Sequence, residues 1–418
     1  MPLIAGQPRF TPVSLVPNGT GGVVPSSALC WRLEELTTAL AHVERVWEAA
    51  AAKNPFVSPS FLRVMHAAAA PTDRTICALG SDAEGVPMAA WILRLDRAGT
   101  LHFLPREYSD QSTCIVLPRV DVHALGEGLA FAARETGARR LELTNIPSWG
   151  LTLGAVRHAM GCLGWPGRAF PAWPCPVLRV PAGAGAGAVL RESIEQHKRL
   201  RGYANALRRE PGYAFEVLED ATDLDGWCGD FCDAHEARWN GTESPSPYSK
   251  PADRALLRAT LGAWATDAVL VRFAIRNGGR RVALVAALRA RTRLIYHHVV
   301  ASPVAERSRA GHVLIRLIGL WMSDRAFDAL DFGAGGEAYK FRYANVDEPL
   351  WRVFAASNPL SRTFVRGIVE ERIRRSPVLQ RGWDRMTNGH LGVEMRQWLT
   401  AVLARATSSP TVDRTATD

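Results

Sequence analysis

The sequence has no long apolar run. Across its 418 residues, no segment reaches the roughly 18 uninterrupted apolar residues that a membrane helix needs. The opening stretch, MPLIAGQPRFTPVSLVPNG, also lacks the basic-then-apolar order of a secretory signal. These two absences predict a cytoplasmic protein, in which the glycosylation sequon at Asn18 has no use.

Cysteine is sparse, and its pattern argues against structural roles. The seven cysteines are an odd number, widely scattered in a large chain, which excludes a disulfide framework. Cys228, Cys232 and His235 have a spacing that suits metal ligands, but they coincide with a helix's apolar stripe and lack a fourth partner. The sequence therefore predicts no metal site.

Lysine is almost absent. Only four of the 50 basic residues are lysines, a bias that fits genome composition better than function and that singles out Lys198 and Lys340. The net charge of +9 favours an anionic partner, such as a nucleotide cofactor, an RNA or a lipid surface. Because this excess is modest for the length, it selects no single partner.

The chain is long enough for two domains. The stretch PAGAGAGAV is low in complexity and uncharged, as a linker is. The sequence predicts an N-terminal domain over 1–180, a linker over 181–189, a C-terminal domain over 190–405 and a disordered tail over 406–418.

Hydrophobic periodicity divides the second half into a clear series of elements. One strongly basic helix is expected over 187–210, ended by Pro211-Gly212, and a three-stranded antiparallel meander is expected after two further helices. In order, the predicted elements are helices at 223–239 and 252–266, strands at 268–276, 281–290 and 293–301, a helix at 312–325, strands at 329–333 and 349–357, and helices near 361–375 and 390–405.

The first half contains a fainter copy of this order. A meander of strands over 74–80, 86–95 and 100–104 precedes a helix at 122–137 and a strand at 139–145. Recurrence of the same order in both halves indicates an ancient duplication.

Several stretches together resemble a known family. They are NPFVSPSFL at 54–62, the basic helix, HEARW at 235–239, ERSRAGHVL at 306–314 and DFGAGGEAYKFRYAN at 331–345. This combination resembles the CelD/BcsL group of GNAT-type acyltransferases, which is related to the FemAB peptidyltransferases. The resemblance implies an α/β (α+β mixed sheet) fold of tandem GNAT-like domains, each a mainly antiparallel sheet flanked by helices.

The resemblance also implies a reaction. A GNAT-type enzyme moves an acyl group from acyl-CoA, which is acetyl-CoA or a longer thioester, to an amine or hydroxyl by direct attack. The expected acceptor is a small molecule or a saccharide precursor, and N-acylation is favoured over O-acylation.

The turn before the helix at 312–325 is similar to the family's pyrophosphate-binding turn. Helix N-termini favour phosphate, and Arg307 and Arg309 can add charge-assisted hydrogen bonds. Gly311 and His312 complete the expected cofactor site, although His312 replaces the usual second glycine. The alternative is an ordinary loop with solvated arginines. In GNAT folds the strand before this turn lies beside the thioester, which adds Val299 and Val300 to the implied donor site.

The stretch IYHHVV on that strand offers a base. Alternation places Tyr296 and His298 on one face and His297 on the other, and histidine titrates in the range that proton transfer needs. His298 is the favoured catalytic residue and Tyr296 a substrate contact. The alternative is that one histidine is a core residue and the other is exposed.

The loop at 331–345 offers a competing base. Glu337 can accept the acceptor's proton, Tyr339 can donate one to the leaving thiolate, and Lys340 can hold an anionic acceptor. The alternative is that Glu337 caps a helix that begins at Ala338. Arg201, on the basic helix, is expected to bind substrate phosphates, or simply to be solvated.

Two rival functions stay open at this point. The first is a FemAB-like transferase that uses aminoacyl-tRNA, and the second is a non-catalytic interaction protein with a GNAT fold. The acceptor, the acyl chain length and the oligomeric state do not follow from the sequence.

Overall fold

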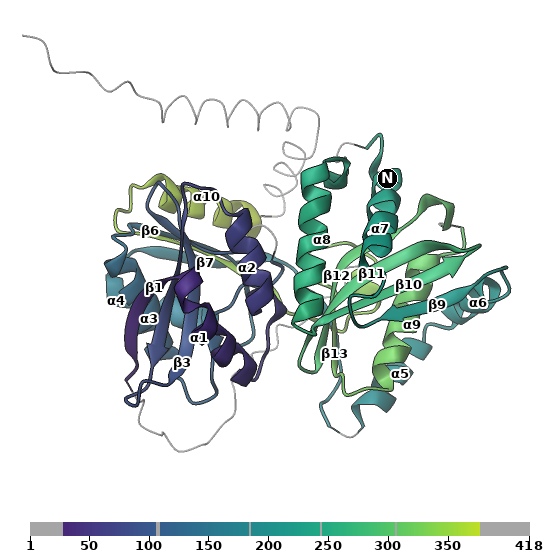
Figure 1. Cartoon of the computed structure of the whole chain (residues 1–418), viewed down its shortest axis with the longest axis horizontal. Coiled ribbons are helices and arrows are strands. Elements are labelled where there is room, and N and C mark those ends of the chain that lie inside the picture. The colour runs from purple at the N-terminus through teal and green to yellow at the C-terminus, as the bar shows by residue number, and fades with distance from the viewer. Residues whose placement is uncertain (1–27, 106–108, 184, 243–244, 306, 377–418) are drawn as a thin grey trace, which may run out of the picture.

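The computed structural model describes residues 28–105, 109–183, 185–242, 245–305 and 307–376. The helix expected near 390–405 and the expected tail at 406–418 lie outside these residues. The described residues form two mixed sheets flanked by helices, and the two sheets stand beside one another (Figure 1). The predicted α/β fold class is therefore confirmed.

The first sheet takes most of its strands from the first half of the chain. Its order is β1 (Cys30–Glu35), β2 (Arg74–Ser81), β3 (Pro87–Leu95), β4 (Thr100–Phe103), β6 (Arg140–Pro147), β15 (Leu350–Ala356) and β7 (Gly167–Trp173), and β5 (Ile115–Val116) also pairs with β3. Its helices are α1 (Leu36–Ala49), α2 (Pro59–Ala68), α3 (Val122–Glu135), α4 (Thr152–Leu163) and α10 (Arg362–Arg375). Every pairing on this path is antiparallel except that of β4 with β6.

The second sheet belongs to the rest of the chain. Its order is β14 (Val346–Asp347), β8 (Pro176–Arg179), β13 (Ala329–Asp331), β12 (Arg293–Ala301), β11 (Arg280–Ala290), β10 (Leu270–Asn277) and β9 (Ala214–Leu218). Helices α5 (Ala186–Glu195), α6 (Lys198–Leu207) and α9 (Ala310–Ser323) pack on one face. Helices α7 (Leu224–Trp239) and α8 (Pro251–Thr266) cover the other face.

The same order of elements recurs in both sheets, as the sequence predicts. Each sheet has a strand, two helices, three antiparallel strands, one helix and a strand that pairs in parallel with the third strand of the meander. The parallel pairs are β4 with β6 and β12 with β13. The chain therefore builds one architecture twice.

Two strands pair in the sheet formed mainly by the other half of the chain. β8 precedes the low-complexity stretch at 181–189, yet it pairs in the second sheet with β13 and β14. β15 follows the second sheet's strands and pairs in the first sheet, between β6 and β7. Each sheet is thus completed by a strand from the other half of the chain.

The expected single basic helix is wrong, because the chain turns at Gln196 and His197 and forms two helices, α5 and α6. The apolar pattern supplies the reason. Leu190 and Ile194 face inward on α5, and Ala204 and Leu207 do so on α6. At about 100° per residue these two stripes differ in direction by roughly a quarter turn. One straight helix could not bury both stripes against α9.

The two sheets share one hydrophobic core. A single cluster of buried residues joins α1, α2 and the β2–β3 face to α7, α8 and the strands β10–β12. Trp264 of α8 lies at its centre: its indole N–H donates to the Pro55 carbonyl at 3.0 Å, and its ring stacks on Phe61 at 4.8 Å between centroids. Figure 1 shows α2 and α8 facing one another between the sheets.

We expect Trp264→Ala to lower the free energy of unfolding by about 3–5 kcal/mol, because it leaves a cavity in the shared core. Chemical denaturation followed by far-UV circular dichroism should show one transition for both sheets, moved to lower denaturant. Leu360→Ala, at a side chain that is 83% exposed, is the control and should leave the midpoint nearly unchanged. Two separate transitions, with only one shifted, would contradict a shared core.

Candidate active site

Strands β12 and β13 diverge next to Tyr296 and His298, two of the site residues that the sequence predicts. They pair in parallel only through Arg293–Ile295 and Ala329–Asp331. From Tyr296 onward, no strand of the described chain pairs with that edge of β12. The free edge leaves backbone donors and acceptors available to a ligand.

A β-bulge lies at the point of divergence. Ala286 stands opposite His298 and Ala287 opposite Tyr296, which leaves His297 as the extra residue. A bulge re-aims the side chains around it. Tyr296 packs in the core on the α9 side, whereas His298 contacts Phe231 and Trp264 on the α7–α8 side. The expectation that Tyr296 and His298 share a face is therefore wrong.

His297 has a carboxylate partner from the first half of the chain. Its Nδ1 lies 2.7 Å from Asp110 Oδ2, and its ring contacts those of Phe56 and Trp264. Burial alone would raise the pKa of Asp110, but the nearby charges of His297 and Lys340 outweigh it and lower that pKa. Asp110 is therefore ionised at neutral pH.

His298, the favoured base from the sequence, lies in an aromatic setting. Burial, followed by the neighbouring His297 and His235, holds the pKa of His298 well below its usual range. Its ring centroid is 4.1 Å from that of His297. At neutral pH the His298 imidazole is thus uncharged and weakly basic.

A fully buried carboxylate closes the paired end of β12 and β13. Asp331 accepts hydrogen bonds from Arg293 Nη1 at 2.6 Å, Gln111 Nε2 at 2.6 Å, Cys175 Sγ at 3.1 Å and the Gly333 backbone N–H at 2.8 Å. The second guanidinium nitrogen, Nη2 of Arg293, donates to Glu348 at 2.7 Å. We call Asp331, Arg293, Glu348, Gln111 and Cys175 the buried ionic cluster.

The charges of this cluster stabilise one another. Burial favours the neutral form of Arg293, but Asp331 and Glu348 outweigh that effect and raise its pKa. The pKa of the Cys175 thiol is raised well above its usual value by burial and by the Asp331 carboxylate, so this thiol stays protonated and donates.

The stretch NPF holds the loop that carries Asp110 and Gln111. Asn54 is buried, and its amide donates to the Gln111 carbonyl at 3.0 Å and to Thr113 Oγ1 at 2.9 Å. Its side-chain oxygen accepts from the Phe56 N–H at 2.9 Å. Part of the family-like stretch at 54–62 thus positions a loop beside β12.

The glycine-rich loop after β13 is folded around Lys340. The Lys340 ammonium donates to the Ala334 carbonyl at 2.7 Å and lies 3.0 Å from Glu337 Oε2. The Lys340 side chain is 6% exposed, whereas that of Glu337 is 56% exposed. Lys340 therefore organises the loop, and the Glu337 carboxylate faces solvent.

The alternative role for Glu337, capping a helix that begins at Ala338, does not fit the described loop. The chain forms only the 3₁₀ turn η4 (Lys340–Arg342) there, with no capping side chain. Tyr339 precedes this turn, and burial and then the Glu337 charge raise the pKa of its phenol, which stays protonated.

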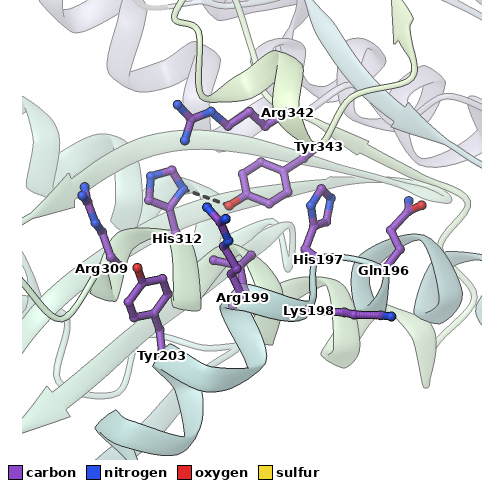
Figure 2. Close-up of a pocket in the computed structure, with 10 residues that line it drawn as sticks. Gln196, His197, Lys198, Arg199, Tyr203, Arg309, His312, Arg342 and Tyr343 are labelled. Atoms are coloured by element: carbon purple, nitrogen blue, oxygen red, sulfur yellow. Dashed lines mark hydrogen bonds between the residues drawn. The ribbon is translucent and has the colours of Figure 1, made fainter.

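A basic cavity of about 550 Å³ lies where the N-termini of α6 and α9 meet η4 (Figure 2). His312 Nδ1 and Tyr343 Oη are hydrogen bonded at 2.8 Å within it. Burial, Arg342 and Arg309 lower the pKa of His312. No carboxylate is among the lining residues, which are Gln196, His197, Lys198, Arg199, Leu200, Tyr203, Arg309, His312, Arg342 and Tyr343.

The cavity unites some of the predicted donor-site residues. Arg309 and His312 line it, together with Lys198, whereas Arg307 is exposed outside the lining. Arg201, one helical turn after Lys198, does not line the cavity; its Nη2 atom lies 3.7 Å from Glu195 Oε2.

The other expected donor residues lie around the same strand end. Gly311 approaches the Ala301 side chain at the end of β12. Val299 and Val300 lie on the part of β12 that is unpaired on the β13 side among the described strands, and Val300 is the more buried of the two.

Neither a metal cluster nor a membrane-spanning helix occurs among the residues that the structure describes. No three His, Cys, Asp or Glu side chains in those ranges are placed to hold a metal ion. Cys228 and Cys232 are buried in the core, and His235 Nδ1 is hydrogen bonded to Ser246 Oγ at 2.8 Å. Within the same ranges, every helix is too short or too polar to cross a bilayer.

Comparison with protein families gives a match for the segment that supplies most of the cavity's lining residues. Residues 195–341 match the family described as "Acetyltransferase (GNAT) domain". This segment is similar to GNAT acetyltransferase domains. The match covers α6, the strands β9–β13, the turn before α9 and the Glu337 loop. No curated protein matches the chain.

Solved structures extend the likeness to most of the chain. FemX aligns with a TM-score of 0.56 and 8% identity, over 78% of this chain and 96% of that one. L-PGS from Bacillus licheniformis aligns with a TM-score of 0.50 and 14% identity, over 80% and 97%. A tandem GNAT protein from the clavulanic acid biosynthesis pathway aligns with a TM-score of 0.41 and 11% identity, over 79% and 99%. At these identities, likeness shows the fold and not the activity. The described chain repeats one order of elements in two sheets, and the second sheet contains the segment that is similar to GNAT domains.

Sequence reasoning missed Asp110, Gln111, Arg293 and Asp331. For Asp331 the only local signal was a charged residue at the end of an apolar strand, in ALDFG. A charged residue in that position is equally consistent with a strand end that is exposed to solvent.

We expect Asp331→Asn to lower the free energy of unfolding by about 3–5 kcal/mol, because it removes one charge from a buried, hydrogen-bonded pair. Urea denaturation at constant pH measures this change. The matched control is Asp225→Asn in the exposed pair with Arg258, where we expect about 0–1 kcal/mol. Equal effects of the two substitutions would show that the buried ionic cluster does not stabilise the fold.

Proposed function

We propose that the protein is an acyltransferase that moves an acyl group from acyl-CoA to an amine or hydroxyl by direct attack. The observation that carries this proposal is the basic cavity at the N-terminus of α9, most of whose lining residues belong to the segment that matches the GNAT domain. The proposed acceptor is a small molecule or saccharide precursor, with nitrogen preferred over oxygen and no metal required. The motifs further suggest a relation to the CelD/BcsL group.

The phosphates of the donor are proposed to bind in the basic cavity. Backbone N–H groups at the start of α9 and the side chains of Arg309, Arg342 and Lys198 all favour anions there. Tyr203 of α6 is 39% exposed at the cavity and offers a ring for stacking on a base. The thioester then lies along Val299 and Val300, where the free edge of β12 can polarise its carbonyl.

Catalysis needs a proton acceptor for the nucleophile and a donor for the leaving thiolate. The candidates from the sequence are Glu337 and His298 as base and Tyr339 as donor. Support comes from the exposed Glu337 carboxylate and from the raised pKa of Tyr339, which keeps its phenol protonated. In this proposal Lys340 positions Glu337 through their ion pair. Tyr296 supports β12 by packing in the core on the α9 side.

Aminoacyl-tRNA is the second candidate donor. The same cavity is lined by Lys198 and Arg199, and exposed Arg201 of α6 and Arg208 just after it extend a basic run that suits a nucleic-acid backbone as well as CoA. Acyl-CoA is preferred because the basic side chains of three elements converge on one space of about 550 Å³, which suits the phosphates of a single nucleotide.

We expect acetyl-CoA or a longer acyl-CoA to bind, and Arg309→Ala and Arg342→Ala each to weaken binding about 10-fold or more, because each removes a charge-assisted hydrogen bond to phosphate. Isothermal titration calorimetry at two salt concentrations measures the affinity. Arg258→Ala, on an exposed face of α8, is the matched control and should bind like the unmodified protein.

The same titration separates the rival functions. Absence of acyl-CoA binding, with tight and strongly salt-dependent binding of bulk tRNA, would move the donor assignment to aminoacyl-tRNA. Absence of both would favour a non-catalytic interaction protein. In that case a Glu337→Ala, His298→Ala double variant would retain its cellular role.

A further inference from the structure

We infer that His297 and Asp110 form a composite acid–base pair, in which the second sheet supplies the proton acceptor and the first half of the chain supplies the carboxylate that positions it. His297 is the catalytic residue in this inference, and Asp110 is a positioning residue. The inference rests on the proposed acyl transfer and names the base for it.

The hydrogen bond between them fixes the state of the imidazole. An ionised carboxylate can only accept, so the His297 Nδ1–H donates to Asp110 Oδ2 across 2.7 Å. The lone pair of the neutral ring then resides on Nε2. A neighbouring carboxylate that holds this tautomer also stabilises the imidazolium that forms when Nε2 takes a proton.

The pair lies where β12 and β13 part. His297 is the bulged residue of β12, and Asp110 lies beside Gly333, just after β13. A Cβ atom at Gly333 would stand 3.0 Å from Asp110 Oδ2, and Gly333 has φ +69°. Any larger residue would crowd the carboxylate, which explains the first glycine of the loop.

Asp110 is held by partners on both sides of the interface. Its neighbour Gln111 donates to the buried Asp331, and the Gln111 carbonyl accepts from Asn54. The loop therefore cannot shift without breaking the buried ionic cluster. The base is complete only when both sheets are assembled.

Few charged groups act on the imidazole. The His297 imidazole lies next to the His298 ring of the same strand and next to Asp110 of the loop. The charge of Lys340 acts on the Asp110 carboxylate. Phe56 of η1 (Pro55–Val57) and Trp264 of α8 cover the ring with apolar surface. By contrast, no carboxylate of the described residues is hydrogen bonded to His298.

The proposed step balances without any further reactant. The nucleophile's N–H or O–H proton passes to His297 Nε2 as a C–N or C–O bond forms at the thioester carbon. The tetrahedral intermediate collapses, the C–S bond breaks, and the electron pair leaves on the thiolate. The proton returns from the imidazolium to the thiolate, which gives free CoA and regenerates the base.

The test compares His297→Asn with Asp110→Asn in the full chain. Asparagine at 297 keeps an N–H donor for Asp110 but removes the ring Nε2, so the interface should persist. Acetyl-CoA binding is measured by calorimetry, and thiol release from acetyl-CoA is measured with water and with a panel of primary amines as acceptors. His123→Gln, at an exposed histidine of α3, is the control.

We expect His297→Asn to reduce turnover about 10²–10⁴-fold while acetyl-CoA affinity stays unchanged. Asp110→Asn should reduce turnover about 10-fold or more while acetyl-CoA affinity stays unchanged, because the imidazolium loses its counter-charge as it forms. A purely structural role of Asp110 would instead weaken acetyl-CoA binding together with turnover.

Other outcomes separate the failure of this inference from that of the proposed function. If the unmodified protein neither binds acetyl-CoA nor releases thiol, the proposed function fails, and the inference fails with it. If it binds without releasing thiol to water or any amine, the inference alone is overturned. Full turnover by His297→Asn, or loss of turnover only in His298→Asn or Glu337→Gln, would also overturn it.

Discussion

The structure depends on neutralising one carboxylate. Asp331 is fully buried at the end of β13, and an unpaired charge there would cost several kcal/mol. Its partners come from β12, from the segment before β8 and from the loop that holds Gln111. A single ionic requirement therefore brings together the strand end, both sheets and the loop that carries Asp110.

The bulge in β12 is the second constraint. One extra residue turns His297 and His298 towards the α7–α8 side and leaves Tyr296 in the core on the α9 side. It lies next to the place where β13 stops pairing, so a free strand edge and an imidazole occupy the same region. The site that we propose for acyl transfer needs both features.

The basic cavity has a similar origin in packing. Leu190 and Ile194 dock α5 on α9, and the turn at His197 then lets α6 dock separately. That turn places the start of α6 near the start of α9, where Lys198 and Arg309 line one space. A continuous helix would have carried its basic residues away from the turn before α9.

Sequence reasoning predicted the order of elements well. Apolar residues that alternate along the chain predicted the β10–β12 meander, and apolar residues at helical spacing predicted α7, α8 and α9. The same patterns predicted the duplicated order in the first half. These patterns are local, because each depends on residues a few positions apart. The family-like stretches also identified the segment of the GNAT domain, and they nominated Arg309 and His312, which both line the cavity.

Only the tertiary structure decided which residues meet. Gln111 and Asp331 are 220 residues apart, and Asp110 and His297 are 187 apart, so no local pattern relates them. The exchange of β8 and β15 between the sheets has the same cause, because strand pairing depends on backbone hydrogen bonds that any apolar strand can offer. The sequence by itself determined most of the helices and strands and the chemical groups that they carry. The burial of charge and the packing of helices on the two sheets decided where that chemistry is assembled.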